Sequence, residues 1–518
     1  MANSEPLIMT FDYGTQSVRA SIFDKRGNML AMEKEVYAPA YFSPKPGWAE
    51  QDPDYYFRCL CACTKRLAAR HPELVTRVKG ITQTCFRDSA VLLDADNQVV
   101  RPMVLWLDQR FAKCEKPLNF KTRLIFKLVG MTDVINMNRK RTIANWLIEN
   151  EPENWARVSK YLHASTYFIY KLTGLMKNSA ADHVGHYPLD YKNRCWYKDP
   201  GHHIQGQIFS VKKSMLCELV PEGDPIGPIS AEGAEATGLP KGMIIYACGS
   251  DKSCETLGTG VIDTSMASIS LGTAATIETT SKKWIQPVPL FPAYPACLPD
   301  YYNLDIQIYR GYWMINWFLK EFAAQRINDV VVDDIDVNDY NADLDKVPAG
   351  SGGLILQPYW GPGLQRPLVK GAIVGFTDTT TKECFYRAII EGIDYALREG
   401  MEGFEKQIGH TFTSLRISGG GSKSDQICQI TADIMGLPVS RVQTNETSSL
   451  GAAIAGFLAI KEFHDPYEAV TNMVHEADVF TPDYKTHEIY NKLYKEGYEK
   501  LYPSLRSTYE SLCAFTKY

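Results

Sequence analysis

The chain of 518 residues has no long apolar run, no basic tract and no secretory leader. Its longest apolar stretch, residues 450–460, falls short of the about 20 apolar residues that a membrane-spanning helix needs. The N-terminal sequence Met-Ala-Asn-Ser-Glu-Pro lacks the basic and apolar regions of a signal peptide. A net charge of −5 and a pI near 6.1 argue against a nucleic-acid or acidic-membrane surface. We therefore expect a cytoplasmic protein whose partners include neither nucleic acid nor a membrane.

The cysteines form no disulfide framework. There are 13 of them, an odd number without regular spacing, which is typical of reduced thiols in a cytosol. Cys59, Cys61 and Cys63 lie two residues apart in residues 53–69, whose pattern predicts a helix. Residues i and i+2 of a helix point to different faces, so we expect these thiols to pack in the core and not to bind a metal.

The first candidate for binding an anion is a hairpin near the N-terminus. Residues 7–24 read as strand, tight turn and strand, with Gly14, Thr15 and Gln16 in the turn. A P-loop or a three-glycine dinucleotide motif would instead open a helix, so the pattern argues against both. The backbone N–H groups and hydroxyls of the turn still suit an anion, and Arg19 adds a guanidinium.

Polar residues also follow two further predicted strands in the first half. Residues 78–84 and 90–94 read as strands around Arg87 and Asp88, which are either a surface ion pair or a donor and acceptor for neighbouring hydroxyls. A strand over 103–107 ends at Trp106 and leads to Asp108. The pattern predicts helices over 142–149 and 155–172.

Asp251 follows a buried strand predicted over residues 242–250 and precedes a turn punctuated by glycine. Carboxylates at strand ends are where open α/β folds place their chemistry, although Asp251 could equally be an ordinary helix N-cap. A second strand–Gly-Thr–strand segment surrounds Gly272 and Thr273, so we infer a weak internal repeat of the phosphate hairpin. The length predicts at least two domains, which we assign to residues 1–258 and 259–518.

The second half carries one glycine-rich junction. Residues 415–418 read as a strand, Gly419 to Gly421 as a turn, and residues 425–435 as a helix. Such a junction points a helix N-terminus at a ligand, which favours nucleotide binding. Upstream, Thr380 and Glu383 predict a capping box for a long helix that ends near residue 407.

Six segments in this order make the chain resemble the FGGY family of ATP-dependent carbohydrate kinases, which includes glycerol, xylulose, ribulose and autoinducer-2 kinases. The segments are Asp12-Tyr-Gly-Thr-Gln-Ser-Val-Arg19, Trp48-Ala-Glu-Gln-Asp-Pro53, Trp106-x-Asp108-x-Arg110, Asp251, Leu271-Gly-Thr273, and Gly419-Gly-Gly-Ser-Lys-Ser424 with Ala432-Asp433-Ile-x-Gly436-x-Pro438. The resemblance implies an α/β, actin-like ATPase fold of two ribonuclease-H-like domains with a central cleft. It also implies that the sugar binds the N-terminal domain and ATP mainly the C-terminal one.

The resemblance implies roles for single residues as well. Asp251 would be the general base, and Asp12 and Asp251 would hold Mg²⁺. The residues implied to bind ATP are Gly14, Thr15, Gln16, Arg19, Gly272, Thr273, Asn316, Gly420 and Ser424. Those implied to bind the sugar are Arg87, Asp88, Trp106, Asp108 and Lys252.

Departures from the family pattern leave the acceptor open. Arg87-Asp88 stands where glycerol and autoinducer-2 kinases carry Arg-Glu and xylulose kinases carry Met-His. Lys252 replaces Gln or Asn, and Tyr13 replaces a smaller or amide residue. The acceptor stays open among ketoses, polyols and acidic sugars, and a cation at Lys252 beside the base would favour extra negative charge or a polarised carbonyl. We expect a small carbohydrate, a ketose or related sugar in preference to glycerol or another polyol, and leave a homodimer open. A non-catalytic actin-like scaffold is a more distant alternative, and a dinucleotide-dependent dehydrogenase is disfavoured by the missing three-glycine motif.

Overall fold

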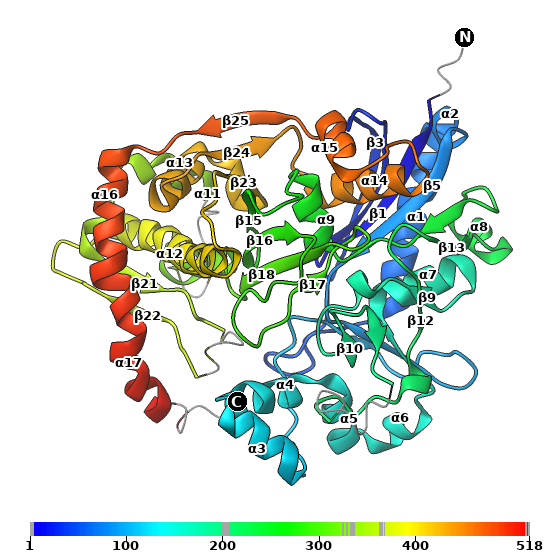
Figure 1. Ribbon diagram of the computed structural model, residues 1–518, viewed down its shortest axis with the longest axis horizontal. Coiled ribbons are helices and arrows are strands. Elements are labelled where there is room, and N and C mark those ends of the chain that lie inside the picture. Colours follow the sequence, from blue (N-terminus) through cyan, green and yellow to red (C-terminus); the bar gives the residue numbers. More distant parts are fainter. Residues whose placement is uncertain are drawn as a thin grey trace.

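The computed structural model describes residues 5–198, 207–323, 326–327, 330–331, 337–361, 366, 368–512 and 515. Two mixed β-sheets lie side by side, with helices around them (Figure 1). Each sheet has its own apolar core, and a third cluster of buried residues joins the two halves. Within the described ranges no helix is both long and apolar enough to cross a membrane.

The first sheet is built by residues of the N-terminal half. In spatial order its strands are β13 (Pro225–Pro228), β14 (Ile244–Tyr246), β5 (Val78–Cys85), β1 (Leu7–Tyr13), β2 (Ser17–Phe23) and β3 (Met29–Val36). Strands β1, β2 and β3 are antiparallel, while β5 runs parallel to β1 and β14 parallel to β5. The hairpin expected at the N-terminus is therefore confirmed, with Asp12 opposite Arg19.

The second sheet repeats this arrangement. Its strands are β17 (Tyr294–Pro295), β18 (Tyr302–Ile308), β16 (Ala275–Ser281), β15 (Met266–Leu271), β23 (Ser414–Ser418), β24 (Val439–Val442) and β25 (Glu476–Phe480). Strands β15, β16 and β18 are antiparallel, and β23 and β24 continue parallel to β15. The same order of three antiparallel and two parallel strands in both sheets confirms the inferred repeat and is the ribonuclease-H-like topology.

Two equivalent helices cross between the sheets. Helix α9 (Asp251–Gly258) follows β14, and α14 (Thr447–Ala459) follows β24, the corresponding strand of the other sheet. They approach so closely that a Cβ atom added to Gly451 would lie 1.8 Å from the Cys254 carbonyl oxygen. Helix α14 packs on the first sheet, where Thr82 Oγ1 donates to the Ala452 carbonyl at 2.8 Å. The halves are thus joined by α9 and α14, whose close packing requires a glycine at the contact (Figure 1).

The remaining elements cover the sheets or extend from them. In the N-terminal half, a small sheet of β4 (Glu50–Gln51), β7 (Met103–Val104), β6 (Ala90–Leu93) and β8 (Lys160–His163) adjoins helices α1 (Pro53–Arg70), α2 (Pro72–Val75), α3 (Phe120–Leu128), α4 (Thr132–Arg141), α5 (Ile143–Asn150), α6 (Pro152–Arg157), α7 (Ala164–Thr173) and α8 (Ala231–Thr237). In the C-terminal half lie α10 (Trp313–Phe318), α11 (Val337–Ala342), α12 (Lys382–Ile408), α13 (Asp425–Met435), α15 (Pro466–Met473), α16 (Tyr484–Leu493) and α17 (Glu499–Leu512).

Three local predictions need correction. The helix expected over 155–172 is divided, because residues 160–163 form β8 and pair with β6. The strand expected over 103–107 ends at Val104. The long helix α12 is capped by Thr381 and not by Thr380, whose hydroxyl instead accepts the Thr377 N–H of the preceding turn. Cys59, Cys61 and Cys63 are buried in α1, as expected.

Candidate active site

Asp251 begins helix α9 at the junction of the two halves. The strand expected to reach residue 250 ends at Tyr246, and the expected glycine turn is helical as far as Gly258. Ser250 therefore takes the N-cap position, and Asp251 Oδ1 accepts the Lys252 N–H at 2.8 Å. Burial raises the pKa of Asp251, while Lys252 and Arg87 act against this shift. A carboxyl group whose pKa is raised is a stronger base than an ordinary aspartate, which suits it to take a proton.

Asp12 lies at the end of β1, close enough to Asp251 for their charges to interact. Burial raises the pKa of Asp12 to about 7, Arg19 opposes the shift, and Glu446, Asp251 and Glu255 add to it. Arg19 lies 3.6 Å from Asp12 and 2.8 Å from Glu446, which precedes α14. Several carboxylates thus meet with too little positive charge to neutralise them.

This excess of carboxylates fits a divalent cation. In the described part of the chain no three His, Cys, Asp or Glu side chains form a ready-made metal cage. Mg²⁺ does not need one, because it commonly keeps several waters and binds one or two carboxylates together with the phosphates of a substrate. Asp12 and Asp251 therefore form a suitable donor set for Mg²⁺ carried by a nucleotide.

The predicted ATP-binding segments of the C-terminal half lie next to one another. The β15–β16 turn holds Gly272 and Thr273, whose carbonyls accept the N–H groups of Tyr312 and Trp313 at 3.0 and 3.3 Å. A Cβ atom on Gly421 would lie 2.4 Å from the Tyr312 ring, so the glycine loop packs against the same residues. Gly420 has open space around it.

Two further predicted ATP-binding residues flank that loop. Asn316 lies exposed on α10, one turn after Tyr312. Ser424 is the N-cap of α13, and its hydroxyl accepts the Ile427 N–H at 3.4 Å. Part of its role is therefore to stop the glycine loop and begin the helix.

Arg87 is held between the two halves. It lies in the turn between β5 and β6, and its Nε donates to Ser250 Oγ at 3.1 Å. Its other nitrogens face the second sheet, where NH1 forms an ion pair with Asp305 of β18 and NH2 lies 3.7 Å from Glu278 of β16. These partners could not be predicted from the sequence, and Arg87 does not form the surface ion pair with Asp88 that was one of the two interpretations. The other interpretation, a donor and an acceptor for neighbouring hydroxyls, stays a prediction.

Asp88 is anchored by a histidine that the sequence did not single out. Its backbone is left-handed, with φ of 54°. Oδ1 accepts the His186 N–H at 2.8 Å, and Oδ2 lies 2.6 Å from His186 Nδ1. The Asp88 side chain is 31% exposed, so it can still accept a bond from a ligand.

The two tryptophan motifs form one unit next to the first hairpin. Trp106 Nε1 donates to Thr15 Oγ1 at 3.0 Å, which places the indole beside the expected phosphate turn. Asp108, however, is used inside the protein. Its oxygens accept the Ala49 N–H at 2.6 Å and Arg110 Nε and NH2 at 2.8 and 2.7 Å. Arg110 and the Ala49 N–H thus hold the Asp108 carboxylate in place, and its contact with the sugar stays a prediction.

Comparisons with known proteins accord with this geometry. The model of the FGGY family of carbohydrate kinases, N-terminal domain, matches residues 7–258, and that of the C-terminal domain matches residues 267–460. The chain belongs to the FGGY family of carbohydrate kinases. It is an ATP-dependent phosphotransferase that acts on a carbohydrate, with the two-domain actin-like fold.

Three relatives illustrate the breadth of this family of kinases. The uncharacterized sugar kinase YgcE of Escherichia coli (strain K12) is 27% identical over 98% of this chain and 96% of its own. A xylulose kinase of Lactococcus lactis subsp. lactis (strain IL1403) is 27% identical over 94% and 95% of the two chains. The crystal structure of a gluconate kinase from Lactobacillus acidophilus covers 98% of this chain and all of its own, with a TM-score of 0.80 at 23% identity, and shares the fold.

Lys252 of this kinase is not turned outward. Its ammonium donates to Glu255 Oε2 at 2.6 Å and to Ser270 Oγ at 2.8 Å on β15, so it connects α9 to the second sheet. The sequence predicted a cation beside the base, and the structure adds the carboxylate that pairs with it. A signal for Glu255 was available, since residues i and i+3 of a helix are neighbours.

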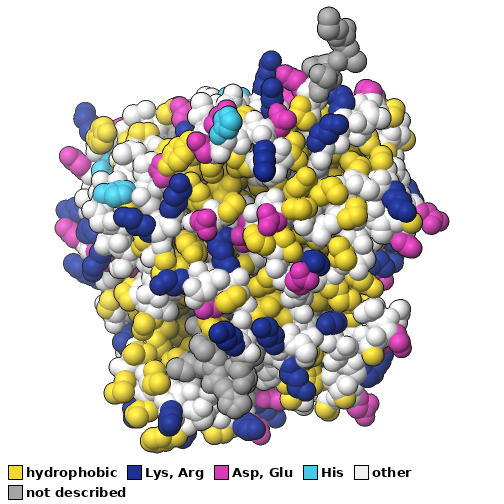
Figure 2. Space-filling model, turned by 45° about the vertical axis from the view of Figure 1, so that its right-hand side comes forward, with side chains coloured by type: hydrophobic (Ala, Val, Ile, Leu, Met, Phe, Trp, Pro, Cys, Tyr) yellow, Lys and Arg dark blue, Asp and Glu magenta, His cyan; other side chains and the backbone are white. Residues whose placement is uncertain are grey.

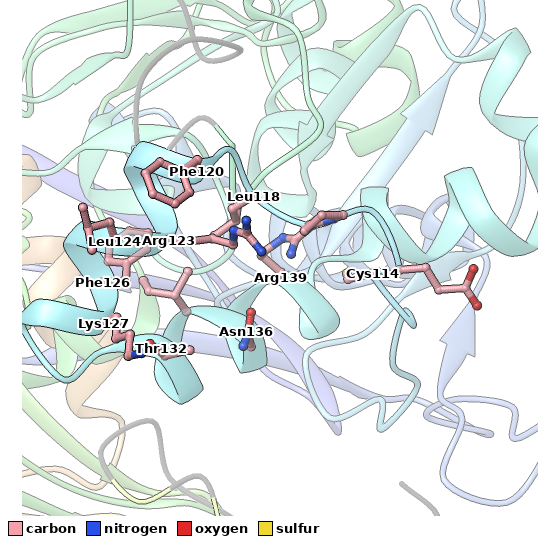
Figure 3. A pocket seen from close by; sticks show the side chains of 13 residues that line it. Cys114, Leu118, Phe120, Arg123, Leu124, Phe126, Lys127, Thr132, Asn136 and Arg139 are labelled. Carbon is pink, nitrogen blue, oxygen red and sulfur yellow. The ribbon is translucent and has the colours of Figure 1, made fainter.

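A cavity of about 540 Å³ lies apart from these carboxylates, between α3 and α4 (Figure 3). Arg123 and Arg139 extend toward each other within it, and Leu118, Phe120 and Leu124 supply apolar walls. None of the residues predicted to bind ATP or sugar lines it. On the face shown in Figure 2, basic and acidic side chains are interspersed.

Proposed function

We propose that this kinase transfers the terminal phosphoryl group of ATP to a hydroxyl of a ketose or related sugar, with Asp251 as the general base. The observation that carries the proposal is that the carboxylates of Asp12, on β1, and Asp251, at the start of α9, lie close enough for their charges to interact. Phosphoryl transfer requires in-line positioning and neutralisation of charge more than covalent catalysis. Asp251 would take the proton that the acceptor hydroxyl loses as it attacks phosphorus.

Asp12 and Asp251 would hold Mg²⁺, directly or through water, and the ion would neutralise charge on the outer phosphates of ATP. The N–H groups of both Gly-Thr turns would hold the phosphates: Gly14, Thr15 and Gln16 from one side and Gly272 and Thr273 from the other. Arg19 would add a guanidinium, and Asn316, Gly420 and Ser424 would line the nucleoside. With this division of roles, residues 1–258 would form the sugar domain and 259–518 the ATP domain.

The charge pairing at the acceptor side favours an uncharged sugar. Arg87 and Lys252 already have the carboxylate partners Asp305 and Glu255, so neither offers a guanidinium or ammonium without a partner to a sugar acid. Asp88 and the Trp106 indole suit hydroxyl groups and an apolar sugar face. One relative is a xylulose kinase, and xylulose is a ketose. Glycerol or another polyol remains the second candidate, because Arg87 followed by an acidic residue resembles glycerol kinases.

The proposal is tested by measuring ADP release with C3 to C6 polyols, ketoses and sugar acids. The expected result is the highest kcat/KM with a ketose; the highest value with glycerol or a sugar acid would refute the acceptor class. ATP turnover that does not respond to any sugar would instead support a non-catalytic scaffold.

The general base is tested separately by Asp251→Asn. The amide retains the shape but cannot take a proton, and loss of a general base typically lowers kcat by about 10²- to 10⁴-fold. Binding of ATP, measured by calorimetry, should persist. Near-wild-type turnover would show that another group removes the proton.

A further inference from the structure

Arg87 connects the two halves of the molecule through a buried network. Its guanidinium comes from the first sheet, and the two carboxylates facing it, Asp305 and Glu278, stand directly opposite each other on β18 and β16. The side chains of Asp305 and Glu278 are 4% and 2% exposed, and that of Arg87 is 13% exposed. Burying these charged groups costs free energy because each loses its hydration, and each therefore needs a partner of opposite charge to offset that loss.

The two carboxylates do not contribute equally. Burial raises the pKa of Glu278 to about 8, and the neighbouring Asp305 adds to this shift. Thr256 of α9 donates to Glu278 Oε2 at 2.9 Å, which gives that side chain a local partner. Asp305, which forms the ion pair with Arg87 NH1 while Glu278 lies 3.7 Å from NH2, is therefore the nearer of the two partners.

Arg87 has few other restraints. Apart from the two carboxylates, the guanidinium has two contacts within the described ranges: a hydrogen bond to Ser250 Oγ at 3.1 Å and the Tyr294 ring, whose centre lies 5.5 Å from the guanidinium carbon. An arginine side chain has several rotatable bonds, so one hydrogen bond and one ring contact leave it alternative positions. Ser250 directly precedes Asp251, so a shift of the guanidinium would change the hydrogen bonding of the residue next to the proposed base.

We propose that Asp305 is a positioning residue, supplied by the second sheet, that fixes the Arg87 guanidinium for the acceptor sugar bound at the first. This inference rests on the proposed acceptor site. It means that the acceptor site of the first half is complete only when the second half is docked against it. The acceptor specificity then depends partly on a residue that lies 218 positions from Arg87 in the chain.

The first test is Asp305→Asn, with the exposed Asp300→Asn as control for loss of one charge. Asn tolerates the left-handed backbone of residue 300, where φ is 63°. We expect Asp305→Asn to lower kcat/KM for the acceptor by roughly ten- to a hundredfold, as for an unpaired buried partner. KM for ATP should remain within about twofold of the wild-type value. A wild-type acceptor kcat/KM, or an equal loss of ATP affinity, would overturn the proposal.

The second test is a double-mutant cycle with Arg87→Gln. If Asp305 acts through Arg87, adding Asp305→Asn to Arg87→Gln should change acceptor kcat/KM by less than about threefold. The proposal would be overturned if the double variant lost acceptor kcat/KM by the product of the two single-variant losses. If Asp305→Asn does not fold, judged by circular dichroism, the cycle is run with Asp305→Glu, which keeps the charge but moves it by one methylene. The Asp251→Asn result decides the base assignment separately and leaves this cycle interpretable.

Discussion

Replacing Gly451 by alanine should impair catalysis through the helix crossing that carries Asp251. The added Cβ would lie 1.8 Å from the Cys254 carbonyl oxygen and 2.6 Å from its carbon, both backbone atoms that no rotamer change can move. A Cβ atom added to Gly258 on α9 would likewise lie 1.9 Å from the Thr447 carbonyl oxygen. Real Cβ contacts are almost never below 3.0 Å, so α9 and α14 must separate by more than about 1 Å.

Overpacking of this kind typically lowers the free energy of unfolding by about 1–3 kcal/mol. Up to about 1 kcal/mol of this loss is regained, because alanine has a higher helix propensity than glycine. The loss of activity should be larger, since a displacement of about 1 Å near a reacting group can cost about 10²-fold in rate. We therefore expect Gly451→Ala to lower kcat/KM by about two orders of magnitude while lowering the free energy of unfolding by at most about 3 kcal/mol.

The assay pairs urea unfolding with steady-state kinetics, and the matched control is Gly403→Ala. Gly403 lies inside α12, where an added Cβ meets nothing within 4 Å. That variant should keep its activity and gain up to about 1 kcal/mol. If Gly451→Ala were as active as the control, close contact of the two helices could not be what positions Asp251.

Three further predictions concern pH, the acceptor and motion. Burial raises the pKa of Asp394 in α12 from 3.8 to about 8, so the folded state binds more protons than the unfolded state between pH 4 and pH 8. Its contribution to stability must fall as pH rises through that window, by up to about 1.4 kcal/mol per pH unit, and Asp394→Asn should remove this slope in urea unfolding; an unchanged slope would contradict the shift. Asp88→Asn, which tolerates the left-handed backbone, should raise KM for the acceptor about tenfold and leave KM for ATP unchanged, and a selective effect on ATP would place Asp88 elsewhere. The halves should close when ATP and acceptor are both bound, excluding water; small-angle scattering profiles that do not change would argue against closure.

The features that could be predicted from sequence are those decided by near neighbours in the chain. A glycine and hydroxyl residues between two alternating strands predict a hairpin, and both hairpins formed. The glycine loop before α13 and the buried cysteines of α1 are local in the same sense. The helix predicted over residues 160–163 was wrong, because Lys-Tyr-Leu-His fits a helix locally and forms a strand only by pairing with β6.

The part of the site that could not be predicted consists of the charge partners that come from the other half of the molecule. Each cation that the sequence offered to a ligand has a carboxylate partner in the fold: Arg19 with Glu446, Arg87 with Asp305, and Lys252 with Glu255. Two of these partners come from the other half of the molecule, and strand order and helix docking decide such pairs. A sugar acid would have to displace a buried carboxylate from its cation, leaving that carboxylate without compensation. The pairing that sequence could not reveal is therefore the strongest physical reason to expect an uncharged acceptor.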